Sequence, residues 1–202
     1  MNYWSLLKKP FFGQFRKPWR WPAAYDDIER WQEVEFWSES GATLKGIYGA
    51  ATTEQVSGSI VCAHPMVVSA KAFFLKHGQA NTFRANGFNV LLFDINGFGE
   101  SEDGDFNLPA DIFAAGQTMA SIAPDYPIGH YGISFGAAMG VCACAFPDQP
   151  YQAALFESPF TTLDEFWRKY YLPYIFLQAG NVIFPRAMSE LRPIDKLLKI
   201  QG

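Results

Sequence analysis

The sequence predicts an α/β fold with a mostly parallel sheet that is covered by helices on both faces. Short apolar segments alternate along the chain with stretches of helical character. Most of these segments lack the polar alternation of a half-exposed strand, so both of their faces are expected to be buried. One junction, Gly132-Ile133-Ser134-Phe135-Gly136, has the small residues that a sharp turn from a strand into a helix requires.

The first half of the chain contains the following expected elements. Residues 31–38 and 43–48, joined by a turn at 39–41, predict an antiparallel hairpin. Apolar strands are expected at 58–63 and 88–93, with one helix over 70–86 between them that ends at Gly87. A glycine-rich loop follows at 96–101. A helix is expected at 109–122, with Asp111 in its first turn, where the helix dipole favours an acid.

The second half continues the alternation. A buried strand at 126–131 leads into a helix at 134–146, whose small residues recur at helical spacing and let it approach a sheet closely. Another apolar strand is expected at 152–156. The sequence from Thr162 to Glu165 is a capping box that opens an aromatic helix.

The length and composition of the chain predict one domain with a sizeable core. The chain has 202 residues, of which 49% are hydrophobic and 17% aromatic, which excludes a disordered chain. It contains no run of 18 apolar residues and no apolar N-terminal stretch long enough for a secretory signal. Its cysteines, Cys62, Cys142 and Cys144, are interpreted as apolar fillers, and their odd number favours a reducing, cytoplasmic setting.

Charge and aromatic content set the N-terminus apart. Residues 1–24 are basic and contain no acid, whereas the whole chain has a net charge of −4. The remaining residues are therefore acidic, which argues against nucleic-acid binding. We expect residues 1–30 to form an arm whose aromatic side chains pack on a domain of residues 31–202. The alternative, a contact of residues 1–24 with a membrane surface or partner, is weakened by Pro10, Pro18 and Pro22, which prevent one continuous amphipathic helix.

Five stretches together resemble the α/β-hydrolase family, and more narrowly bacterial serine hydrolases of the serine aminopeptidase and acyl hydrolase type. They are residues 34–46, 60–65, 87–101, 132–136 and 157–160, within a resemblance that covers residues 31–202. The resemblance implies an α/β-hydrolase fold with Ser134 as the nucleophile of a G-x-S-x-G elbow. It also implies that residues 161–190 begin a cap, that the substrate is a small acyl or ester compound, and that no cofactor takes part.

One departure from the family concerns the oxyanion hole. The family has His-Gly after its third strand, where this sequence has His64-Pro65. Proline lacks an N–H, so the donor is expected to be the N–H of Met66, with that of Phe135 as the second.

A second departure is that no histidine follows Ser134. The family order is Ser, acid, His, with the acid on a seventh strand. We therefore expect this chain to be truncated before the seventh strand, leaving residues 152–156 as an exposed edge prone to self-association. Among the histidines present, we expect His130 to be buried in the sheet layers, His64 to orient the oxyanion loop, and His77 to lie at the surface.

The remaining acidic residues near the expected site are assigned structural positions. Glu157 ends a strand near Ser134, Asp94 braces the glycine-rich loop, and Asp164 and Glu165 belong to a helix start. The histidines lack metal-ligand spacing, and the loop at 96–99 lacks the Gly-Lys-Ser/Thr of a phosphate cradle. The function predicted is hydrolysis of carboxylic ester or related acyl bonds, with an apolar substrate indicated by the aromatic segment 166–177. The alternative is a catalytically inactive binding or interaction protein.

Overall fold

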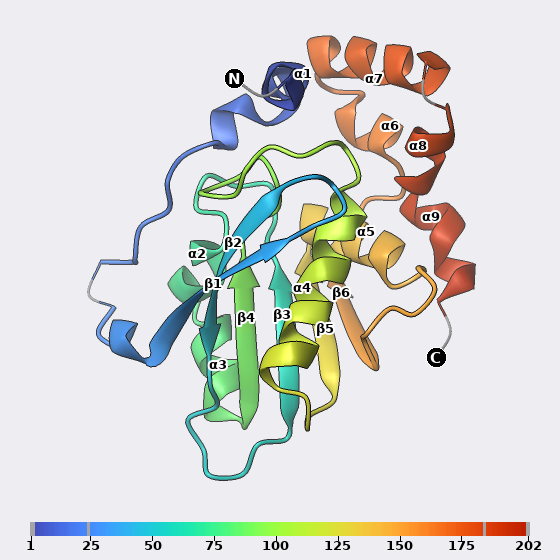
Figure 1. Ribbon diagram of the computed structural model, residues 1–202. Coiled ribbons are helices and arrows are strands. Elements are labelled where there is room, and N and C mark those ends of the chain that lie inside the picture. The colour runs from blue at the N-terminus through green and yellow to red at the C-terminus, as the bar shows by residue number, and fades with distance from the viewer. Residues whose placement is uncertain (1–2, 24, 184, 201–202) are drawn as a thin grey trace.

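The predicted α/β fold is confirmed in a computed structural model, in which residues 3–23, 25–183 and 185–200 are described (Figure 1). A six-stranded sheet runs through the described part of the chain in the order β1-β2-β4-β3-β5-β6. The strands are β1 (Trp31–Trp37), β2 (Thr43–Gly49), β3 (Gly58–Ala63), β4 (Phe88–Phe93), β5 (Ile128–Ile133) and β6 (Ala153–Glu157).

Strand direction follows the predicted pattern. β1 and β2 form the expected antiparallel hairpin, and β2 is also antiparallel to β4. β4, β3, β5 and β6 are parallel, with Ala63 of β3 beside Gly132 of β5 and Ile133 of β5 beside Glu157 of β6. The carboxyl ends of β3, β4, β5 and β6 therefore meet at one edge of the sheet, at the top in Figure 1.

Helices cover both faces of the sheet. α4 (Leu108–Ile122) and α5 (Phe135–Ala143) lie on one face, and α2 (Ala72–Lys76) and α3 (Gln79–Ala85) lie on the other. The expected single helix over 70–86 is wrong, because Gly78 adopts a left-handed conformation (φ +80°) that divides it into α2 and α3. The apolar pattern continues across this break, so periodicity alone does not reveal it.

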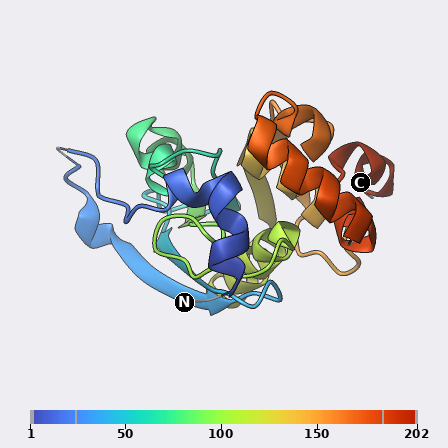
Figure 2. The same cartoon turned by 90° about the horizontal axis from the view of Figure 1, so that it is seen from above.

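The N-terminal arm packs on the domain. α1 (Tyr3–Phe12) and a 3-10 turn, η1 (Gly13–Phe15), lie over the end of the sheet where the parallel strands terminate, as Figure 2 shows from above. Phe11 and Phe12 are buried in the core that α4 and α5 share. An extended segment then leads through a second 3-10 turn, η2 (Ile28–Arg30), into β1, and Trp19 and Trp21 pack against the opposite core.

The C-terminal part of the chain is helical. It contains α6 (Leu163–Trp167), α7 (Tyr171–Ile183), α8 (Pro185–Glu190), α9 (Pro193–Lys196) and a final 3-10 turn, η3 (Leu197–Lys199). The predicted cap of α6 is half formed: the Thr162 hydroxyl accepts from the Glu165 N–H at 3.2 Å, but the Glu165 carboxylate accepts from the Thr161 hydroxyl. No helix in residues 3–23, 25–183 and 185–200 is both long and apolar enough to cross a membrane.

β6 forms one border of the described sheet, as the sequence predicts for residues 152–156. Ala153, Ala154 and Leu155 are exposed, and Leu155 keeps 61% of its surface accessible. The C-terminal helices leave this strand uncovered and pack instead on the α5 side of the sheet, where α9 contacts α5. An apolar strand at a free sheet border offers unpaired backbone groups to another strand.

Candidate active site

Ser134 occupies the turn between β5 and α5. Its backbone has φ 51° and ψ −106°, a conformation that residues with a side chain rarely adopt. Strain of this kind costs about 1–3 kcal/mol and persists only where surrounding structure enforces it. Here the Ser134 N–H donates to the carbonyl of Glu157 at 2.8 Å, and the side chain is half-buried at the end of the sheet.

Two glycines make the turn sterically possible. A Cβ on Gly132 would lie 2.7 Å from the Cα of Ala137, and one on Gly136 would lie 2.1 Å from the carbonyl oxygen of Ala63. Real side chains do not approach backbone so closely, so both positions require glycine. The small residues therefore let the start of α5 press against the end of β3.

The oxyanion donors named from the sequence lie on two adjacent segments. Phe135 is the first residue of α5, so its N–H lies outside the hydrogen bonds of the helix. Met66 follows β3 in a loop closed by a hydrogen bond from the Val67 N–H to the Pro65 carbonyl at 2.8 Å. The loop reaches α5, since a Cβ on Gly136 would lie 2.8 Å from the carbonyl oxygen of His64.

His64 holds that loop in place. Its Nδ1 lies 2.8 Å from the Pro65 carbonyl, and its Nε2 accepts from the Ile95 N–H at 3.1 Å. Both ring nitrogens are thus used within the protein, which assigns the proton to Nδ1. Burial lowers the pKa of His64, so the ring stays neutral. This geometry agrees with the loop-orienting role expected for His64.

His130 is buried beneath α5, among the rings of Tyr151 and Phe156. Neither ring nitrogen forms a well-aligned hydrogen bond with the described residues. Desolvation lowers its pKa to about 4, opposed in part by the Gly136 carbonyl. A Cβ on Gly140 would lie only 2.1 Å from the Nε2 of His130, so the ring packs directly beneath the helix where Gly140 lacks a side chain.

His77 lies at the C-terminal end of α2, on the other face of the sheet. It is exposed, and its ring packs on Phe73 at 4.3 Å. Taken with His64 and His130, it leaves no histidine of this sequence placed to accept the proton of Ser134.

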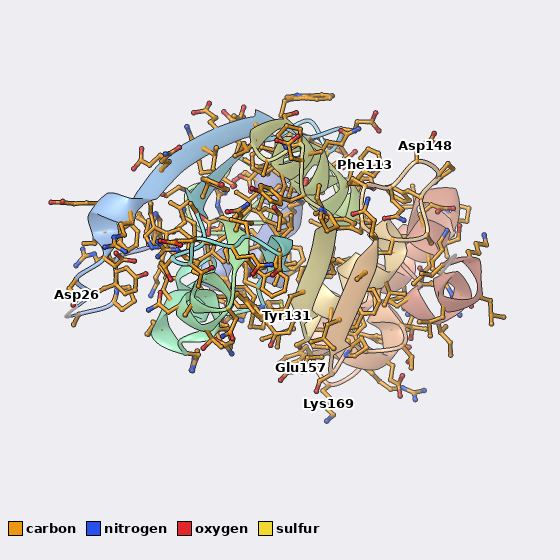
Figure 3. All side chains as sticks on the ribbon, turned by 90° about the horizontal axis from the view of Figure 1, so that it is seen from below. Asp26, Phe113, Tyr131, Asp148, Glu157 and Lys169 are labelled. Atoms are coloured by element: carbon orange, nitrogen blue, oxygen red, sulfur yellow. The ribbon has the colours of Figure 1, made fainter. Side chains whose placement is uncertain are left out.

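Glu157 borders the site through its backbone, while its side chain turns to the α2–α3 face. There its carboxylate accepts from the Tyr131 hydroxyl at 2.7 Å, and both residues are labelled in Figure 3. Burial, helped by the carboxylate, raises the pKa of Tyr131. The structure does not bring the Glu157 carboxylate to a histidine.

The glycine-rich loop after β4 is braced by Asp94, as expected. Its carboxylate accepts from the backbone N–H of Lys71 at 2.9 Å, from the Lys71 ammonium at 2.6 Å and from the Glu100 N–H at 3.0 Å. Both charged side chains of this ion pair are buried. Asp164 and Glu165 likewise bond near the start of α6, to Gln178, Asn181 and Thr161.

Sequence reasoning missed a buried polar cluster that fixes α1 over the site. Asp111 accepts from the hydroxyls of Ser38 (2.7 Å) and Ser40 (2.6 Å) and from the side chain of Asn96 (2.6 Å). The Lys8 ammonium of α1 donates to Asn96, and desolvation lowers its pKa to about 8. A lysine in a basic, aromatic arm gives no sequence signal of burial. The position of Asp111 in the first turn of a helix is explained equally well by the helix dipole.

The arm also contacts the site directly. The ring of Phe12 packs against Phe135, the residue after Ser134, with centroids 5.6 Å apart. It also packs against Phe98 of the glycine-rich loop at 5.3 Å and Trp167 of α6 at 6.2 Å. α1 therefore forms part of the surroundings of Ser134 rather than a separate appendage.

No metal centre is formed by the residues that the structure describes, since they contain no group of three His, Cys, Asp or Glu able to hold an ion. The three cysteines are buried and unpaired. Desolvation raises the pKa of Cys142 and Cys144 to about 12, so these thiols are not ionised at neutral pH.

Comparison with solved structures defines the fold. An esterase of Pyrococcus furiosus superposes with a TM-score of 0.67 and 16% identity, over 93% of this chain and 72% of the other. An alpha-beta hydrolase of Vibrio vulnificus gives 0.64 and 15%, over 95% and 71%. A carboxyl esterase of Bacillus coagulans gives 0.55 and 16%, over 80% and 55%. No protein-family model and no curated sequence matches this chain. The chain has the α/β-hydrolase fold.

Proposed function

We propose that this chain carries the nucleophile of a serine hydrolase that acts on carboxylic esters or related acyl bonds. The observation that carries the proposal is the strained backbone of Ser134 at the junction of β5 and α5. A serine held in this way presents its hydroxyl at the end of the sheet, which is the arrangement of a nucleophile elbow. Structural neighbours that are esterases support the same reaction class.

In the proposed reaction, the Ser134 Oγ gives its proton to a general base as it bonds to the carbonyl carbon of the ester. The carbonyl π electrons move to the oxygen, and the N–H groups of Phe135 and Met66 stabilise that oxyanion, each contributing about 3 kcal/mol. Collapse of the tetrahedral intermediate breaks the ester bond, and the protonated base gives its proton to the leaving oxygen, which departs as the alcohol. Water then hydrolyses the acyl-serine and regenerates Ser134.

This reaction needs a general base that none of the three histidines supplies. Both nitrogens of His64 are bonded within the protein, His130 lies beneath α5, and His77 lies on the opposite face of the sheet. We propose that the base and its orienting acid are contributed by a segment that residues 1–202 do not contain. No cofactor is needed, and the buried thiols suit a reducing, cytoplasmic setting.

The proposal is tested by measuring turnover of short p-nitrophenyl esters. We expect the 202-residue chain to match its Ser134→Ala variant, since losing triad members lowers the rate by about 10⁴–10⁶. If the gene reads on past residue 202, the longer product should be active and should lose that activity with Ser134→Ala, but not with Ser121→Ala on the surface of α4. A longer product whose activity survives Ser134→Ala would contradict the proposal.

A second candidate function is binding without turnover. It is favoured by the commitment of His64 and His130 to structural contacts, which leaves the fold intact and the serine unactivated. Under this alternative, no longer product shows Ser134-dependent ester cleavage.

A further inference from the structure

A cavity of about 490 Å³ lies between α1, the start of α4 and the helices α6 to α8. Its lining is largely apolar and aromatic, and includes Trp4, Leu7, Phe106, Trp167, Phe176 and Leu191. This size falls within the range of pockets that bind small molecules. We propose that this cavity binds a single unbranched alkyl chain, and that α1 supplies one of its walls.

The wall formed by α1 is fixed by packing on both sides of the cavity. Phe11 contacts Phe106, which precedes α4, at 5.8 Å and Phe176 of α7 at 6.5 Å, so it connects these two parts of the lining. Trp4 also packs edge-on against Phe106 at 6.4 Å. The buried Lys8 anchors the same helix to Asn96. The cavity is therefore formed before a ligand arrives, which lowers the entropic cost of binding.

The lining selects an apolar ligand. Three polar residues border the cavity: Asp105, Asn107 and Glu190. The Asp105 carboxylate accepts from the backbone N–H of Asn107 at 2.7 Å, and Glu190 pairs with Lys196. Because the rest of the lining is apolar or aromatic, a polar ligand would lose its hydration and gain few partners, which is costly. An alkyl chain loses no hydrogen bonds there, and each buried methylene contributes about fourfold in affinity.

The position of the cavity relates it to Ser134. Ser134 itself is not part of the lining, but Phe12 and Trp167 are, and Phe12 packs on Phe135. An ester whose acyl chain fills the cavity would have its carboxyl end on the Phe12 side. This orientation rests on the proposed function, whereas binding of an alkyl chain in the cavity does not.

The position of the bound alkyl chain can be tested by quenching of tryptophan fluorescence with 10-bromodecanoate, kept below its micelle concentration. Trp4 and Trp167 line the cavity, whereas Trp37 is 65% exposed and lies outside it. We expect saturable quenching that persists in Trp37→Phe and is largely lost in the double variant Trp4→Phe/Trp167→Phe. Quenching without saturation, or equal loss in both variants, would overturn the proposal.

Calorimetry with the saturated C6, C8 and C10 carboxylates measures the chain-length dependence. The dissociation constant should fall about fourfold for each added methylene. Ala179→Phe, which fills the cavity from α7, should weaken decanoate binding at least tenfold, whereas Val182→Phe on the same helix, at an 81% exposed position outside the lining, should leave it unchanged. Equal effects of the two variants, or binding only to anionic vesicles, would refute an internal site. Ester turnover is not measured, so this test can fail while the proposed reaction stands.

Discussion

The N–H of Ser134 donates to the carbonyl of Glu157 at 2.8 Å, which ties the turn after β5 to the end of β6. This bond extends the parallel pairing of the two strands one residue beyond Ile133. The backbone of Ser134 then has to turn away abruptly to enter α5, and its positive φ results. The turn is therefore set by the sheet and the helix together.

Close packing around this turn predicts that alanine substitutions at two glycines differ sharply in their effect on stability. Gly136→Ala should destabilise the protein by about 1–3 kcal/mol, because its Cβ would meet the Ala63 carbonyl oxygen at 2.1 Å. Gly129→Ala on β5 is the control, since its nearest neighbour would be 3.7 Å away. Urea denaturation should show a lower midpoint for the first variant alone. Equal midpoints would mean that α5 does not press on β3.

The buried carboxylate of Asp111 predicts a second stability effect. Asp111→Ala should cost about 3–5 kcal/mol, because it leaves the Ser38, Ser40 and Asn96 donors without their acceptor. Asp125→Ala, at an exposed turn, should change stability by less than about 0.5 kcal/mol. Thermal melting compares the two, and a mild effect of Asp111→Ala would show that the cluster is not structural.

His130 predicts a dependence of stability on pH. Its pKa is about 4 in the folded protein and about 6.5 when unfolded, so the unfolded chain binds more protons between these values. Stability should therefore fall as pH drops from 6.5 towards 4, by up to about 3 kcal/mol from this residue. His64, shifted in the same direction, adds to the loss.

The control for this effect is His130→Leu, which removes one titrating group while keeping the site apolar. Its free energy of unfolding should decline less steeply between pH 7 and 5 than that of the wild type. Parallel pH profiles for the two proteins would assign the decline entirely to other groups.

The free border of β6 predicts self-association. Light scattering after size-exclusion chromatography should show a mass that rises with protein concentration. Leu155→Lys places a charge on the exposed strand and should lower that mass, because inward or edge charges disfavour strand pairing. Leu198→Lys, at a 98% exposed position of η3, should not. A compact monomer at all concentrations would contradict the prediction.

Much of the fold could be predicted from the sequence because buried parallel strands leave continuous apolar segments. The turn at Ser134 was also readable, since Gly132 and Gly136 are dictated by steric contacts within a few residues. The break at Gly78 was missed because an apolar pattern continues through it. The burial of Lys8 and its link to Asn96 could not be found, because they depend on contacts 88 residues apart in the chain.

The central claim is that position 134 is a nucleophile poised for acyl transfer. It is tested most directly by intact-protein mass spectrometry of Ser134→Cys after exposure to p-nitrophenyl butyrate. A thiol at the N-terminal end of α5 ionises without a histidine, because the helix dipole and adjacent N–H groups stabilise the thiolate. We expect one butyryl group on residue 134, formed at least tenfold faster than on Ser121→Cys, with the buried native cysteines unmodified. Equal rates for the two variants would contradict the assignment of Ser134 as the nucleophile.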